Sequence, residues 1–172
     1  MAHALELYFD ANADEAVREI WRAMDSPLID AGARPHVSLA VAEWCDCEPL
    51  RQALDLSRIH NLAITFESIG AFHDPEQPVV YLAARKSPPL AALQHEVWHH
   101  FVIRARNPRP MYSPPHWLPH CTVTYGIENV DALIARCSSV RLPIEARVVE
   151  IGLVDVTPSK VTTVWTETVK EN

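Results

Sequence analysis

Pro119-His120-Cys121-Thr122-Val123 has a counterpart earlier in the chain, Pro35-His36-Val37-Ser38-Leu39. Both stretches read Pro-His-x-hydroxyl-aliphatic, and both lie in short apolar runs flanked by loop residues, a pattern typical of β-strands. Side chains alternate between the faces of a strand, so each stretch places one imidazole and one hydroxyl on one face and aliphatic groups on the other. Two such strands facing each other would form a cleft with two histidines and two hydroxyls, a set suited to acid–base chemistry on a phosphate.

The repetition carries more weight than either motif alone. In a chain with nine histidines, a single His-x-Ser/Thr arises easily by chance and then indicates only a strand with a polar outer face. Here both copies follow a proline, and an amphipathic helix and a proline-bearing loop precede each of them. We therefore expect a duplicated unit and a pseudo-twofold cleft, with motif strands at about 35–43 and 119–125.

Length and composition predict one soluble domain over residues 1–172, with room for two lobes, because 48% of the residues are hydrophobic and 22% are charged. The first residues contain no basic segment followed by a long apolar run, so we expect neither a signal peptide nor a membrane span. Four cysteines without a Cys-x-x-Cys pair favour a reducing, cytoplasmic location. Nothing in the sequence indicates an obligate protein partner.

The net charge of −7 argues against long nucleic acid as the main nonspecific partner, because such binding depends on the neutralisation of phosphates. It favours small nucleotides or short RNA ends. A local basic patch stays open, since the first two-thirds of the chain contain Arg34, Arg85, Lys86, Arg104, Arg106 and Arg109.

Hydrophobic periodicity predicts a mixture of strands and helices, hence an α+β protein. Helices are expected over 13–25 with Asn12 as N-cap, over 48–58, after Ser87-Pro88, and after Asn129. The third of these helices has an apolar stripe formed by Leu90, Leu93, Val97 and Phe101. Further strands are expected at 5–9, 62–72, 79–83, 142–156 and 161–169.

A proline-rich loop over 107–119 leads into the second motif and contains two candidate cleft residues, Tyr112 and Trp117. Their rings either line the cleft and stack on a base, or anchor the loop on the core. The sequence favours neither hypothesis.

A competing signal is His95-Glu96-Val97-Trp98-His99, which matches the His-Glu-x-x-His pattern of zinc metalloproteases. On a helix the two histidines share one face and could bind a metal, with Glu96 as the base. That face lies opposite the apolar stripe, however, so the helix would present it to solvent. Val102 also stands where the metzincin pattern requires glycine. We therefore predict no metal site, and a zinc-dependent hydrolase is the alternative hypothesis.

The two motifs, their separation and the order of elements resemble the 2H phosphoesterase superfamily, and most closely its bacterial 2′-5′ RNA ligase/RNA 2′,3′-cyclic phosphodiesterase branch. Residues 34–40 and 117–123 look like the two signature strands, and the resemblance extends over nearly the whole chain. Ser38 stands where many members have threonine, so the hydroxyl is kept. The resemblance implies a bilobal, LigT-like α+β fold, with two pseudo-symmetric antiparallel-rich sheets and outer helices around a central cleft. It also implies no metal or other cofactor.

The motif residues can supply the chemistry that this resemblance implies. Opening a 2′,3′-cyclic phosphate requires a base that activates water and an acid that protonates the departing 3′ oxygen, and two imidazoles can share these roles at neutral pH. His36 and His120 are the predicted catalytic residues, while Ser38 and Thr122 are predicted to bind the phosphate. Which histidine is the acid and which is the base stays open.

The predicted function is therefore a metal-independent phosphoesterase that acts on the cyclic phosphates of RNA ends or small nucleotides, with reversible 2′-5′ RNA ligation as a possible second activity. A noncatalytic module that binds a nucleotide or an RNA end is a further alternative.

Overall fold

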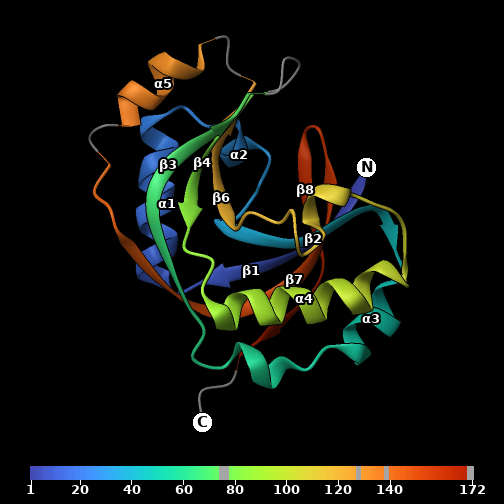
Figure 1. Ribbon diagram of the computed structural model, residues 1–172. Coiled ribbons are helices and arrows are strands. Elements are labelled where there is room, and N and C mark those ends of the chain that lie inside the picture. The colour runs from blue at the N-terminus through green and yellow to red at the C-terminus, as the bar shows by residue number, and fades with distance from the viewer. Residues whose placement is uncertain (74–77, 127–128, 138–139, 170–172) are drawn as a thin grey trace.

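Eight strands form one antiparallel sheet in the computed structural model, which describes residues 1–73, 78–126, 129–137 and 140–169. The strand order is β5-β2-β1-β7-β3-β4-β6, and β8 also pairs with β7 (Figure 1). The strands are β1 (Ala2–Phe9), β2 (His36–Cys45), β3 (Ala63–Phe72), β4 (Val79–Ala84), β5 (Ala105–Pro108), β6 (His120–Tyr125), β7 (Ile144–Thr157) and β8 (Lys160–Thr168). The helices are α1 (Ala11–Ala23), α2 (Pro27–Asp30), α3 (Cys47–Ala53), α4 (Pro88–Val102) and α5 (Val130–Arg136), with short 3-10 turns η1 (Leu56–Ile59) and η2 (Pro110–Tyr112).

The long strand β7 is shared between the two parts of the sheet. Its residues 144–147 pair with β3, and residues 148–156 pair with β1. The first motif strand, β2, pairs with β1, and the second, β6, pairs with β4. Although β2 and β6 are far apart in the strand order, they lie beside each other in space (Figure 1). The curvature of the sheet therefore brings the two motifs together.

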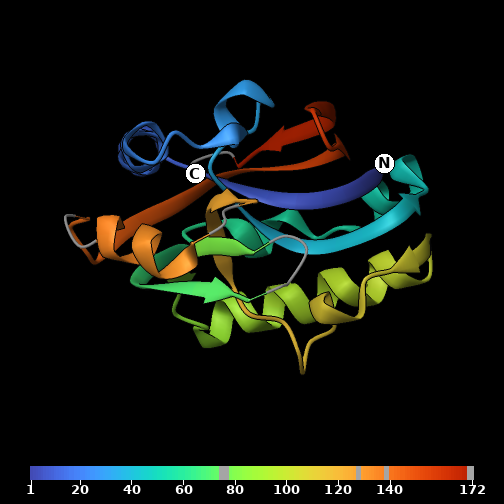
Figure 2. The same ribbon diagram turned by 90° about the horizontal axis from the view of Figure 1, so that it is seen from above.

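Two amphipathic helices, α1 and α4, lie on opposite sides of the β1–β7 layer (Figure 2). The N-cap of α1 is Asp10, whose carboxylate accepts hydrogen bonds from the backbone N–H groups of Asn12 and Ala13. The predicted cap at Asn12 was wrong, because Asp10 also accepts from the Arg147 backbone N–H and so begins the helix directly after β1.

Helix α4 follows the prediction closely. Its N-cap is Ser87, whose hydroxyl accepts a hydrogen bond from the Leu90 backbone N–H, and a proline occupies the first helical position. The predicted apolar stripe is buried against the sheet, and β2 is the strand that it contacts most. The helix thus supports the back of the first motif strand.

Two predicted segments differ in the structure. The single helix expected over 48–58 is divided into α3 and η1, because Leu54 and Asp55 are extended and the Asp55 carboxylate caps the backbone N–H of Ser57. The proline-rich loop contains the 3-10 turn η2. Among the described helices, none has the length and apolar character that a membrane crossing requires.

We expect Phe101→Ala to lower the free energy of unfolding by about 3–5 kcal/mol, since this ring of α4 is fully buried in the core. Ile103→Ala, at the end of the same helix, is the matched control: the side chain is 67% exposed, and the expected change is within about 0.5 kcal/mol. Urea unfolding followed by circular dichroism measures both. Equal losses in the two variants would contradict the packing of α4 on the sheet.

Candidate active site

The two motif histidines have the same local geometry. His36 is the first residue of β2, and its Nδ1 lies 2.6 Å from the Arg34 carbonyl oxygen. His120 is the first residue of β6, and its Nδ1 lies 2.8 Å from the Leu118 carbonyl oxygen. A carbonyl oxygen only accepts, so the Nδ1 atom of each ring carries a hydrogen. In both histidines, Nε2 is therefore the atom available for proton transfer.

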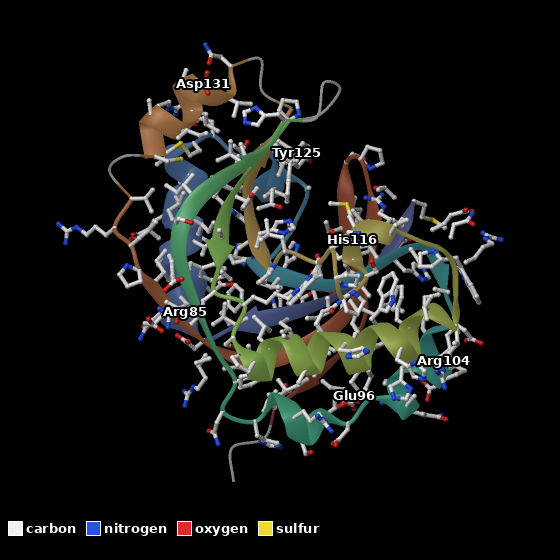
Figure 3. All side chains as sticks on the ribbon, viewed as in Figure 1. Arg85, Glu96, Arg104, His116, Tyr125 and Asp131 are labelled. Carbon is white, nitrogen blue, oxygen red and sulfur yellow. The ribbon has the colours of Figure 1, made fainter. Side chains whose placement is uncertain are left out.

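One pocket brings together all four motif side chains, His36, Ser38, His120 and Thr122. Its remaining polar lining consists of Glu6, Arg109, Tyr112, Tyr125 and Thr157. The rest of the wall is apolar and includes Ala4, Leu28, Val41, Val79, Val156 and Val161. Tyr125, labelled in Figure 3, stands at the end of β6 on this wall. The pocket thus has a polar end at the motifs and a largely apolar remainder.

Indole groups fix the backbone of both motifs. The Nε1–H of Trp21, on α1, donates to the Thr122 carbonyl over 2.9 Å. The Nε1–H of Trp117 donates to the Ser38 carbonyl over the same distance. Gln94 of α4 adds a bond from its Nε2 to the Leu39 carbonyl. The carbonyl of each hydroxyl-bearing motif residue is thus held from a distant part of the chain.

The two candidate cleft aromatics lie in different places. Tyr112 lines the pocket, and its phenol is a hydrogen-bonding partner of the Ser38 hydroxyl. Burial raises the pKa of this phenol, so it stays protonated at neutral pH. Trp117 is buried, is not part of the described pocket lining, and lies under the Lys86 ammonium. Tyr112 is therefore placed to orient Ser38, and Trp117 to hold the backbone behind it.

His120 is packed against two aromatic rings. Its ring centroid lies 5.1 Å from that of Phe72 and 5.2 Å from that of Tyr81. Burial lowers the pKa of His120 and the nearby His36 lowers it further, while the hydrogen bond to the Leu118 carbonyl opposes them. Gly70 is needed for this arrangement, because a Cβ there would lie 2.7 Å from the Tyr81 ring.

His36 has a carboxyl neighbour that the sequence analysis missed. The Oε1 atom of Glu6 lies 3.3 Å from His36 Nε2, and the Tyr8 hydroxyl donates to Glu6 Oε2 over 2.9 Å. Burial raises the pKa of Glu6, although His36, the Tyr8 hydrogen bond and Arg34 act in the opposite direction. The sequence carried no local signal for this contact, because the contact depends on the register that places Glu6 opposite Ser38 and Tyr8 opposite His36.

The six basic residues that left a local basic patch open do not gather at the pocket. Arg34 pairs with Glu150, Arg85 with Glu67, and Arg106 with Glu43. Lys86 donates to the Pro114 and Trp117 carbonyls, and Arg104 donates to the His100 carbonyl. Figure 3 shows Arg85 and Arg104 near the two ends of α4. Of the six residues, Arg109 is the one that lines the described pocket.

The His-Glu-x-x-His segment lies on the outside of α4. His95 and His99 are exposed, and Glu96 pairs with Arg58 of η1 over 2.7 Å (Figure 3). The residues that the structure describes contain no group of three or more side chains able to hold a metal ion. The segment therefore does not form a zinc site with any third ligand among these residues.

Comparison with known proteins identifies the family. The model of the 2′-5′ RNA ligase superfamily matches residues 9–158. No curated protein sequence matches the chain. Among solved structures, apo E. coli LigT is 18% identical, with a TM-score of 0.59 and 99% of this chain and 98% of that chain covered.

Two ligand complexes of E. coli LigT give similar results, each at 16% identity. The complex with 3′-AMP has a TM-score of 0.57 and covers 98% of this chain and 97% of that chain. The complex with NADP+ has a TM-score of 0.56 and covers 98% of each chain. These likenesses confirm the predicted LigT-like α+β fold. Together with the family match over most of the chain, they establish that the protein belongs to the 2′-5′ RNA ligase superfamily, a group of 2H phosphoesterases.

Proposed function

We propose that the protein is a metal-independent phosphoesterase that opens 2′,3′-cyclic phosphates of small nucleotides or RNA ends by two-histidine acid–base catalysis. We propose 2′-5′ ligation, in which a 5′ hydroxyl takes the place of water, as a second activity. The observation that carries this proposal is the geometry of His36 and His120. Both imidazoles line one pocket, and both use Nδ1 for a backbone carbonyl, so both have Nε2 available for the substrate. E. coli LigT, which shares the fold, has been crystallised with 3′-AMP.

In the hydrolytic direction His120 acts as the base and His36 as the acid. The lowered pKa of His120 favours a neutral ring at neutral pH, as a base requires. Its Nε2 takes a proton from water while the water oxygen bonds to phosphorus. The bond from phosphorus to the 3′ oxygen breaks, and His36 protonates that oxygen, leaving a 2′-phosphate. Ser38 and Thr122 donate hydrogen bonds to the nonbridging oxygens.

The charges of the pocket support a small substrate. Arg109 is the one cationic side chain, and Glu6 the one anionic side chain, among the described residues that line it. A chain of several phosphates would need more cations along its path. The apolar wall with Tyr125 suits the face of a nucleobase. We therefore propose a cyclic mononucleotide, or the last nucleotide of an RNA end, as the group that occupies the cleft.

His36→Ala and His120→Ala should each lower kcat/KM for 2′,3′-cyclic AMP by at least about 10²-fold, since each removes one proton-transfer group. The assay is turnover in excess EDTA, with the product position identified. His99→Ala, on the exposed face of α4, is the control and should retain activity. Near-full activity without either motif histidine would contradict the mechanism. Loss of activity in EDTA would favour the zinc hypothesis, and binding without turnover the noncatalytic one.

The acidic limb of the profile of kcat/KM against pH should lie below about pH 6.5, which is the ordinary pKa of a histidine side chain. The reason is that burial lowers the pKa of His120. A base with a lowered pKa loses its proton at lower pH, so the enzyme becomes active at lower pH. Phe72→Ala exposes the ring to water and should move this limb upward. A wild-type limb above pH 6.5 would contradict the assignment of His120 as the base.

Arg109→Gln should raise KM for the cyclic mononucleotide more than it lowers kcat, because this guanidinium binds the phosphate from the edge of the pocket. Arg106→Gln is the matched control, since Arg106 is exposed and pairs with Glu43. The wild-type salt dependence should be shallow, because a single phosphate contact releases few counterions. A markedly steeper slope with a short oligonucleotide, together with a higher kcat/KM, would contradict the small-substrate proposal.

A further inference from the structure

The cleft contains a buried carboxyl group that the two-histidine mechanism does not use. Glu6 is 3% exposed, lines the pocket, and places Oε1 at 3.3 Å from His36 Nε2. Its second oxygen accepts the hydrogen bond from Tyr8. The Tyr8 ring has room because the next strand has Gly152 at that point, where a Cβ would lie 3.0 Å from the ring. Glu6 is thus held in place by Tyr8 of its own strand, β1, and by His36 of β2.

The hydrogen-bonding pattern requires a proton between Glu6 and His36. The Nδ1–H of His36 is committed to the Arg34 carbonyl, so in a neutral ring Nε2 is an acceptor. An ionised carboxylate is also only an acceptor, and two acceptors that face each other repel. The contact is favourable when one proton lies between them, either on Glu6 with a neutral ring or on His36 as an imidazolium beside a carboxylate.

The register of the sheet gives this proton partner to one histidine only. In the first half, Glu6 lies opposite Ser38 and Tyr8 lies opposite His36. In the second half, Tyr81 lies opposite Thr122 and Ala83 lies opposite His120. The residue opposite the hydroxyl-bearing residue therefore differs between the two motifs. It is the carboxyl-bearing Glu6 beside Ser38 and the aromatic Tyr81 beside Thr122. The two similar motifs have electrostatically different neighbours.

Among the described residues, the other titratable groups around the pair do not supply a second proton partner for His36. Arg34 lies over the Tyr8 ring and pairs with Glu150 of β7, so these two charges largely balance each other. The remaining described neighbours are two phenols, a thiol, an imidazole and a guanidinium, which belong to Tyr8, Tyr112, Cys121, His120 and Arg109. Burial raises the pKa of the Cys121 thiol to about 12, so this group stays neutral.

We propose that Glu6 is a positioning residue that shares a proton with His36 and thereby makes His36 the histidine that enters the hydrolytic reaction protonated. This inference rests on the proposed function. The shared proton passes from His36 Nε2 to the departing 3′ oxygen, whose electron pair comes from the broken bond to phosphorus. The proton that His120 takes from water returns to the pair through solvent, so one water is consumed per turnover.

The first test needs only the wild-type protein and no substrate. With ¹⁵N-labelled histidine, NMR spectra across pH follow the proton on each ring. We expect His36 Nε2 to retain its proton to a higher pH than His120 Nε2 does. Loss of both protons at the same pH, or earlier loss from His36, would overturn the inference, whether or not the protein hydrolyses cyclic phosphates.

The second test is Glu6→Gln, which keeps the shape and removes the charge. The proton that the pair shares should then be released at lower pH, because the opposite charge beside the imidazole is gone. The basic limb of kcat/KM should fall with it, so that activity is lost about tenfold at the alkaline end and is nearly kept at the acidic end. A purely structural role would instead lower activity equally at every pH.

Glu150→Gln is the matched control, because this carboxyl group lies on the neighbouring strand and pairs with Arg34 rather than with His36. The basic limb of the kcat/KM profile of Glu150→Gln should stay at the wild-type pH. An unchanged basic limb in Glu6→Gln, in a protein whose activity still requires His36 and His120, would overturn the role of Glu6 and leave the proposed function standing. Absence of turnover in every variant would contradict the proposed function, and the NMR comparison would then decide the proton sharing separately.

Discussion

Two indole N–H groups hold the backbone carbonyls of Ser38 and Thr122, and the geometry of the cleft depends on this pair of hydrogen bonds. Each is worth only about 1 kcal/mol net, but a buried carbonyl left without a donor costs about 1–3 kcal/mol. The two tryptophans come from α1 and from the segment before β6, so each ties a motif strand to a remote part of the chain. The imidazole at the start of each motif strand is fixed in turn, because its Nδ1–H donates a hydrogen bond to the backbone carbonyl two residues earlier.

Two similar histidine motifs can differ in their proton affinity when their neighbouring side chains differ. The alternation of β2 and β6 presents the same two groups to the cleft, an imidazole and a hydroxyl. The strands beside them differ, with the carboxyl of Glu6 next to one motif and the rings of Tyr81 and Phe72 next to the other. Desolvation favours a neutral imidazole, and a carboxylate favours a charged one. The difference therefore arises from the neighbouring strands rather than from the motifs.

The charge distribution agrees with a substrate that carries few phosphates. The protein has a net charge of −7, and several of its arginines are paired with carboxylates on the surface. Such exposed pairs add little to stability, but they reduce the local positive potential that would attract long nucleic acid. Arg109 supplies the cationic side chain among the described residues that line the pocket.

The sequence by itself determined the features that depend on neighbouring residues. The two motif strands, the apolar stripe of α4 and the Ser87 cap follow from periodicities and capping rules that operate within a few residues. Even here a near neighbour competed, since Asp10 rather than Asn12 caps α1. Only the tertiary structure decided the placement of Glu6 beside His36. Alternation with Leu5 and Leu7 makes it look like a solvent-facing residue, yet β1 is buried on both faces.

The contact of Glu6 with His36 depends on the register of β1 against β2, which shifts between Leu5 and Glu6, and no local pattern encodes that shift. The positions of Trp117 and Arg109 were likewise decided by how the sheet curves and where the loop before β6 crosses it. Pairings between residues far apart in the chain come from packing the whole sheet. The motif residues could therefore be picked out from the sequence, whereas the neighbours that make His36 and His120 different required the fold.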